Sequence, residues 1–189
     1  DAVIATGSDN TARYFEYYFK ESKKIIRKSR SSLAILEGNE TENELNGLAS
    51  DIFSYFGLGC RNVSKLFLPL DYDLNQLFSI FYKYKYMINH KKYQNNYDYN
   101  KTMLLMGNNK FVENGFFIMK EDSSLFSPVA MLYYEFYNSQ EIIKQFISDY
   151  SAQIQCIVSK NNIQFGRTQK PKLWDYADGI DTIEFLRNL

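Results

Sequence analysis

Patterns typical of strands and of helices alternate along the whole chain, and this alternation limits the possible folds more than any other feature. Short, mostly apolar runs that indicate strands cover residues 2–5, 63–68, 116–119, 128–136 and 154–158. Amphipathic stretches that indicate helices cover residues 12–19, 45–56, 74–81, 97–106 and 141–150. Alternation of this kind favours a mostly parallel sheet with helices on both faces. The predicted fold class is therefore three-layer α/β, with residues 1–189 forming a single domain.

Residues that cap helices mark several of these boundaries. Thr41 and Glu44 have the spacing of a capping box, so a helix is expected to begin there and to run into Gly57. Asp73 and Ser139 are typical N-cap residues for two later helices. The connections between these elements are short, and short connections on a rigid frame are common places for functional side chains.

A cysteine lies in the connection between the capping-box helix and the next strand. Gly57 ends the helix, Cys60 follows it, and the strand at residues 63–68 comes directly afterwards. Arg61 and Lys65 place two cations near the thiol, together with the backbone N–H groups of the turn. Because such surroundings favour the thiolate over the thiol, Cys60 is predicted to be a nucleophile.

A second candidate site lies where the first strand meets the first helix. Residues 2–5 form the strand, Thr6, Gly7 and Ser8 form a turn, and the helix is expected to end in the basic run of residues 20–30. A glycine turn at such a junction presents free N–H groups to a ligand, as phosphate and dinucleotide sites do. A turn of this kind can also serve folding alone. Because the strand run starts at the second residue, we expect the chain to be the later part of a longer polypeptide.

The cysteine motif resembles that of the aldehyde dehydrogenase superfamily. Members of that superfamily have a glycine three residues before the nucleophilic cysteine and a basic residue five after it, and Gly57, Cys60 and Lys65 occupy those positions. Leu58 stands where a glutamine is usual, and Asn62 stands where a small residue is usual.

Further motifs resemble the same superfamily in their order and spacing. Thr6, Gly7 and Ser8 resemble the turn that faces the nicotinamide. Glu121 and Phe126 resemble its contacts to the ribose and the nicotinamide, with residues inserted between the acid and the aromatic ring. Late glycine motifs of the superfamily match residues 165–166 and 178–180. The resemblance therefore extends over nearly the whole chain and implies an aldehyde dehydrogenase-like catalytic domain.

A narrower resemblance is to bacterial acyl-CoA reductases related to the fatty-acid reductase of luminous bacteria. The segments that carry it are residues 36–41, 57–65, 96–100 and 173–179. It implies that Cys60 accepts a long-chain fatty acyl group from acyl-CoA and that NADPH is the cofactor. The cofactor-binding domain would then lie upstream of this chain, and this chain alone is expected to fold but to have no reductase activity.

One absence distinguishes between reactions within the superfamily. Hydrolytic members place a glutamate about one strand and one helix before the cysteine, where it activates water. Residues 22–32, where that glutamate would fall, contain no acidic residue. Without such a base, attack of water on an acyl-enzyme is slow and exchange with another thiol is favoured. This absence agrees with an acyl-CoA reductase.

Composition excludes several other classes of protein. Lys plus Arg equals Asp plus Glu at 22 each, so no net charge attracts nucleic acid or an anionic membrane. No apolar stretch is long enough for a signal peptide or a membrane span. Two cysteines, Cys60 and Cys156, form no disulfide framework, so a reducing cytoplasm is expected and Cys156 is interpreted as structural. His90 is the only histidine, so no metal site is expected. The oligomeric state stays open between a monomer and a homo-oligomer.

Residues 82–101 are rich in tyrosine and lysine and supply the main alternative. Aromatic rings among cations can stack bases and bind phosphates, so the chain could be a non-enzymatic module that binds a nucleotide or RNA. A polar helical connection on the surface explains the same composition. A third interpretation places the adenine and phosphates of coenzyme A on this segment. The sequence alone does not choose between these interpretations.

Overall fold

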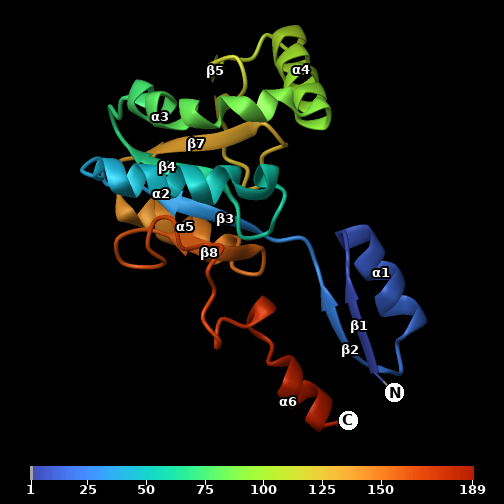
Figure 1. Ribbon diagram of the computed structural model, residues 1–189. Coiled ribbons are helices and arrows are strands. Elements are labelled where there is room, and N and C mark those ends of the chain that lie inside the picture. Colours follow the sequence, from blue (N-terminus) through green and yellow to red (C-terminus); the bar gives the residue numbers. More distant parts are fainter. Residues whose placement is uncertain (1) are drawn as a thin grey trace. The chain divides into compact units, whose positions relative to one another are not determined.

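The computed structural model describes residues 2–189, which divide into two units (Figure 1). The smaller unit holds the residues up to Arg30 together with Lys170–Leu189, and the larger unit holds Ser31–Gln169. The sequence shows no boundary between these parts. The single domain over residues 1–189 stays a prediction, and the two units are described in turn.

A six-stranded sheet forms the centre of the larger unit. Its strand order is β5 (Val112–Glu113), β6 (Ile118–Glu121), β7 (Met131–Tyr137), β4 (Val63–Pro69), β3 (Ser31–Ile35) and β8 (Ile154–Val158). All neighbouring strands are parallel except β5 and β6, which are antiparallel. The prediction of a mostly parallel α/β sheet is confirmed.

Helices cover both faces of this sheet. The helices of the unit are α2 (Glu42–Phe53), η1 (Ser54–Gly57), α3 (Leu74–Phe81), η2 (Tyr82–Asn89), α4 (Lys91–Met106) and α5 (Gln140–Asp149). Successive residues of a strand point to opposite faces. Leu66 and Leu68 accordingly join the large core cluster with α2, α3 and α4, whereas Phe67 joins a smaller cluster with Ile143 of α5. The unit therefore has three layers.

Several predicted boundaries agree with the structure and others differ. The capping box at Thr41 is present, Asp73 caps α3, and the bounds of β8 agree with the prediction. Strand β6 begins two residues later than predicted, because Phe116 and Phe117 are buried in the core without belonging to a strand. Helix α4 begins six residues earlier than predicted.

The smaller unit contains two parallel strands and three helical segments. These are β1 (Ala2–Thr6), α1 (Asp9–Tyr18), β2 (Lys23–Arg27), η3 (Ala177–Gly179) and α6 (Thr182–Arg187). The prediction that α1 ends in a basic run over residues 20–30 is wrong, because part of that run is β2. Ile25 and Ile26 pair with Ile4 and Ala5 across the two strands, and β-branched residues favour such pairing. Arg30 and Asp178 form an ion pair of 2.9 Å within this unit.

The described helices and side chains also bear on two expected absences. No helix among residues 2–189 has the length and the apolar character that crossing a bilayer requires. Within the same residues, no group of three histidine, cysteine, aspartate or glutamate side chains has a geometry that could hold a metal ion.

Candidate functional site

Cys60 lies in a four-residue turn between η1 and β4, and its side chain is exposed. The Asn62 N–H donates to the Gly59 carbonyl oxygen at 2.9 Å, and the Gly59 N–H donates to Asn62 Oδ1 at 2.8 Å. Ser32 Oγ of β3 donates to the Cys60 carbonyl oxygen at 2.9 Å. Three hydrogen bonds thus fix the backbone of the turn that carries the Cys60 thiol.

The backbone just before this turn has an unusual conformation. Tyr55, Phe56 and Gly57 have φ values of 53°, 61° and 73°, so three successive residues adopt left-handed conformations. Only glycine adopts this region without a steric cost, and strained residues cluster at functional sites. The reversal ends the helical segment and turns the chain toward Cys60. Sequence reasoning identified Gly57 as the terminator but missed the two aromatic residues.

Arg61 and Lys65, which the sequence places near the Cys60 thiol, bind partners elsewhere in the fold. Arg61 Nε donates to the Thr168 carbonyl oxygen at 2.6 Å. Lys65 is fully buried, and its Nζ pairs with Glu135 Oε2 at 2.9 Å and donates to the Asp122 carbonyl oxygen. Burial lowers the pKa of Lys65, and the hydrogen bond and charge of Glu135 act in the opposite direction. The charge of Lys65 is therefore balanced inside the fold.

The loop between Glu121, the last residue of β6, and Phe126 is tied to the strand that follows Cys60. Lys65 of β4 holds the Asp122 carbonyl, and Ser64 Oγ donates to the Leu125 carbonyl oxygen at 2.7 Å. Both predicted cofactor contacts are exposed: Glu121 is the last residue of β6, and Phe126 lies on the loop that follows it. The structure thus connects the two motifs through β4, which the sequence did not show.

The same region encloses a small cavity of about 30 Å³. Gly57 and Val63, on either side of the Cys60 turn, line it together with Ser127, Pro128 and Val129 from the loop after Phe126. The predicted nucleophile motif and the end of the predicted cofactor motif therefore share one small cavity in the larger unit.

Asp122 fixes the shape of that loop and supplies a prediction on stability. Although burial opposes its ionisation, hydrogen bonds from Lys120 and Ser124 lower the pKa of Asp122 from 3.8 to about 2. A lowered pKa means that the ionised group stabilises the fold above about pH 4 and loses this effect as the pH falls toward 2. We expect Asp122→Asn to lower the free energy of unfolding by about 2 kcal/mol at pH 7.

The difference should shrink as the pH falls, which urea unfolding of both proteins at pH 7, 4 and 3 measures. Asp98→Asn, at an exposed position of α4, serves as the control and should change stability by less than about 0.5 kcal/mol at each pH. A deficit of Asp122→Asn that stays constant over this range would contradict the assignment.

A buried carboxylate anchors the loop that holds Arg61. Asp51 of α2 is 1% exposed, and its Oδ1 and Oδ2 accept hydrogen bonds from Thr168 N–H (3.1 Å), Thr168 Oγ1 (2.8 Å) and Gly166 N–H (2.6 Å). Helix and loop touch closely, because a Cβ at Gly47 would lie 2.7 Å from the Phe165 carbonyl carbon. Sequence reasoning missed Asp51, although a charged residue among the apolar positions of a helix is a usable signal.

Thr6, Gly7 and Ser8 belong to the smaller unit. The Gly7 N–H donates to the Arg27 carbonyl oxygen at 3.2 Å, and Ser8 caps α1 by accepting from the Thr11 N–H at 3.3 Å. The turn thus lies at the carboxyl end of a parallel strand and at the beginning of a helix, as expected. That it faces the same site as Cys60 stays a prediction.

Residues 82–101 fold as η2 and most of α4, and many of their side chains have partners within the chain. Tyr93 and Tyr97 are buried, and Tyr97 Oη donates to Glu113. Lys101 Nζ also binds Glu113, at 2.8 Å, and Lys83 Nζ donates to Asn46 Oδ1 at 2.6 Å. These contacts favour the helical-connection interpretation over a nucleotide- or RNA-binding module.

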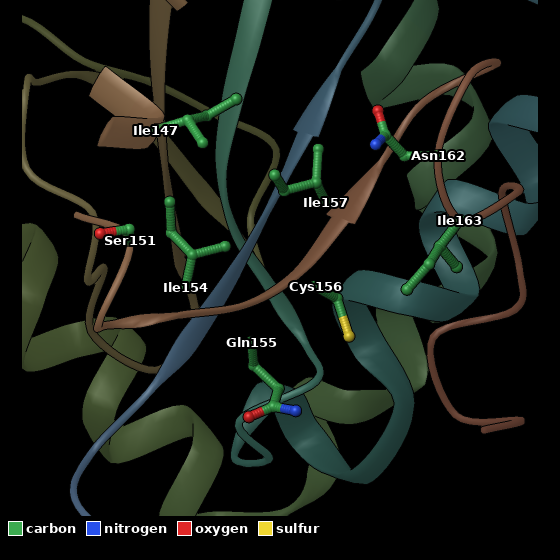
Figure 2. A pocket seen from close by; sticks show the side chains of 8 residues that line it. All are labelled: Ile147, Ser151, Ile154, Gln155, Cys156, Ile157, Asn162 and Ile163. Atoms are coloured by element: carbon green, nitrogen blue, oxygen red, sulfur yellow. The ribbon is translucent and has the colours of Figure 1, made fainter. Parts of the chain in front are cut away.

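Cys156 lies on β8, at the edge of the sheet, beside a cavity of about 410 Å³ (Figure 2). Half of the eight lining residues are isoleucines, namely Ile147, Ile154, Ile157 and Ile163, and three others carry uncharged polar side chains. Among residues 2–189, no charged side chain lines it, and Cys156 itself is 2% exposed. Burial agrees with the structural role predicted for this thiol.

Comparison with known proteins gives matches among solved structures. The chain matches no protein-family model and no curated protein sequence. It matches an indole-3-acetaldehyde dehydrogenase of P. syringae in complex with NAD+ at 11% identity and TM-score 0.60, over 84% of this chain and 39% of that chain. It matches an NAD+ complex of an aldehyde dehydrogenase from Bacillus cereus at 16% identity and TM-score 0.58, over the same shares of the two chains.

A further match is the Δ-pyrroline-5-carboxylate dehydrogenase of Mycobacterium tuberculosis, at 14% identity and TM-score 0.55, over 83% of this chain and 36% of that chain. The chain therefore spans about two fifths of the length of the first structures that it matches, where the covered share is 39%. At such low identity the likeness establishes the fold and nothing finer. The chain has the fold of part of an aldehyde dehydrogenase.

Proposed function

We propose that the chain carries the acyl-accepting cysteine of an NADPH-dependent acyl-CoA reductase. The observation that carries the proposal is the exposed Cys60 on a turn braced by hydrogen bonds, within an aldehyde dehydrogenase-like fold. The absence of any acidic residue in residues 22–32, and the sequence motifs shared with acyl-CoA reductases, support a thioester substrate over hydrolytic aldehyde oxidation.

In the proposed reaction, the Cys60 thiolate attacks the carbonyl carbon of acyl-CoA. A bond forms from Sγ to that carbon, the bond to the coenzyme A sulfur breaks, and coenzyme A leaves as a thiolate that takes up a proton. The step exchanges one thioester for another of similar stability. NADPH, when bound, supplies the hydride that reduces the acyl carbon. The bond to Sγ then breaks, the aldehyde leaves, and Cys60 regains its thiolate.

Negative charge develops on the acyl oxygen in both steps, and backbone N–H groups can stabilise it. Among residues 2–189, the N–H groups of Cys60 and Arg61 donate no hydrogen bond, because the turn is closed through Gly59 and Asn62 instead. The Cys60 N–H is our candidate donor to this oxyanion.

Particular residues fit a nicotinamide cofactor. The turn of Thr6, Gly7 and Ser8 follows a parallel strand and opens a helix of 10 residues, the place where nucleotides bind in α/β folds. Exposed Glu121 can accept hydrogen bonds from ribose hydroxyls, and exposed Phe126 can pack on a nicotinamide ring. These five residues are our proposed cofactor contacts.

The proposal predicts how aldehyde oxidation depends on coenzyme A. With the full-length protein, an aldehyde and NADP+, we expect acyl-CoA to form when coenzyme A is present, because a thiol can take the acyl group from Cys60. Without coenzyme A, oxidation should stop after about one equivalent of NADPH per active site, because no base activates water. Absorbance at the NADPH band and chromatography of the products measure both; the same assay with NAD+ tests the choice of cofactor. Continued release of free fatty acid without coenzyme A would contradict the proposal.

A further inference from the structure

Asn62 is a buried polar residue that joins the Cys60 turn to the end of helix α2. It is 2% exposed, and its side-chain amide uses both ends. Oδ1 accepts from the Gly59 N–H at 2.8 Å. Nδ2 donates to the carbonyl oxygens of Asp51 (2.9 Å), Ser54 (2.9 Å) and Ile52 (3.3 Å).

The three acceptors explain why an amide is needed at this position. The last carbonyls of a helix lack partners within the helix, and buried carbonyls without partners are costly. Nδ2 satisfies such carbonyls at the end of α2, while Oδ1 holds the turn. A small apolar residue at position 62 could do neither, so the position links the orientation of the turn to a rigid helix.

Asn62 also determines which N–H groups of the turn remain free. Its backbone N–H donates to the Gly59 carbonyl oxygen, and its Oδ1 accepts from the Gly59 N–H. Within residues 2–189, the N–H groups of Cys60 and Arg61 are left without a partner. The backbone N–H of Cys60 is therefore held in place and remains free to donate a hydrogen bond.

The Asn62 side chain leaves no room for a Cβ atom at position 59. The φ of Gly59 lies outside the left-handed region, so the backbone conformation does not require glycine. A Cβ at this position would instead lie 2.9 Å from Asn62 Oδ1, closer than real Cβ contacts. Glycine at position 59 is thus required by the asparagine at position 62.

We propose that Asn62 is a positioning residue for acyl transfer: by holding Gly59 it sets the Cys60 thiol and the Cys60 N–H in the geometry that attack on a thioester needs. This inference rests on the proposed function of Cys60. Asn62 touches neither substrate nor cofactor in this scheme and acts through the turn alone.

A double-mutant cycle tests the proposal. The rate of acyl transfer from an acyl-CoA to Cys60, read by mass spectrometry of the Cys60 peptide, is compared with the rate of alkylation of the same thiol by iodoacetamide. Alkylation needs an exposed thiol but no oxyanion donor, so the two rates separate positioning from exposure. The proteins are the wild type, Asn62→Ala, Gly59→Ala and the double variant, with Ile143→Ala of the smaller core cluster as a control for lost stability.

We expect Asn62→Ala to slow acylation by about 10- to 100-fold, since small misplacements of reacting groups cost that much, and to change alkylation by less than about threefold. Gly59→Ala should slow acylation by about 10-fold when Asn62 is present and by less than about twofold when it is absent, because the crowded atom is then gone. Ile143→Ala should lower stability and leave acylation unchanged.

Two results would overturn the proposal in different ways. The role of Asn62 alone would be refuted if wild type and Asn62→Ala were acylated at equal rates. It would also be refuted if Gly59→Ala slowed acylation by the same factor in the wild-type and the Asn62→Ala backgrounds. Wild type that takes no acyl group while Cys60 still reacts with iodoacetamide would refute the proposed function and this inference with it. Should Asn62→Ala not fold, Gly59→Ala alone is compared with the wild type, because it leaves the capping amide in the chain: a slower acylation with unchanged alkylation supports the proposal, and an unchanged acylation refutes it.

Discussion

In the full-length protein, Cys60→Ala is expected to lower the rate of acyl-CoA reduction by about 10⁴-fold or more, because the covalent route requires a nucleophile at this position. The structure gives this residue an exposed side chain on a braced turn, so alanine removes the sulfur and leaves the turn's hydrogen bonds intact. Stability should therefore change little. Steady-state formation of aldehyde, followed with NADPH in excess, measures the loss.

Cys156→Ala is the matched control for this experiment. It removes the other thiol, which is 2% exposed and lies on β8. We expect it to retain activity within about threefold and to lose about 1 kcal/mol of stability, as is common for small core substitutions. Loss of activity in Cys156→Ala with retention in Cys60→Ala would reverse the assignment.

Asp51→Ala is expected to cause the largest loss of stability among the substitutions considered. The buried carboxylate accepts three hydrogen bonds, from Gly166 N–H and from the N–H and hydroxyl of Thr168. Alanine would leave those donors without their acceptor, and hydrogen bonds to charged groups contribute about 1.5–3 kcal/mol each. Allowing for partial relaxation, we expect the free energy of unfolding to fall by about 4 kcal/mol.

Urea unfolding measures that loss, and Asp149→Ala at the exposed end of α5 serves as its control. The control should change stability by less than about 1 kcal/mol. Because Thr168 also holds Arg61 through its carbonyl oxygen, Asp51→Ala should loosen the loop after β8 and the Cys60 turn together. A loss below about 1 kcal/mol would show that Asp51 is not the anchor of this loop.

Local sequence signals correctly predicted the helices whose first residues are capped by side chains. The capping box at Thr41 and the N-cap at Asp73 act through hydrogen bonds within a few residues, so they can be found from spacing alone. Strand β8 stands out as a mostly apolar run, broken only by Gln155, between polar segments. The mostly parallel sheet follows from alternation, which is a property of the whole chain.

Signals that depend on distant neighbours were missed or misinterpreted. Strand β3 begins with Ser31 and Ser32, polar residues that are buried because Ser64 Oγ and the Cys60 carbonyl oxygen are their partners. No pattern within β3 reveals those partners. The basic run that forms β2 was misread for the same reason, since its isoleucines pair with a strand about 20 residues away.

The candidate site shows the same division. Cys60 was predicted from its immediate neighbours, whereas the roles of Asn62 and Asp51 depend on contacts made across the fold. Lys65 stands in the expected position, but its charge is directed into the core, where Glu135 of a neighbouring strand balances it. A sequence places such a residue along the chain, and the packing of the sheet decides where its side chain goes.

The most direct test of the central claim is to find where an acyl group is attached. The protein is incubated with a long-chain acyl-CoA in the absence of NADPH, digested, and its peptides are analysed by mass spectrometry before and after treatment with hydroxylamine, which cleaves thioesters. The account predicts an acyl group on the Cys60 peptide that hydroxylamine removes. An unmodified Cys60 peptide, or acyl label on the Cys156 peptide, would contradict it.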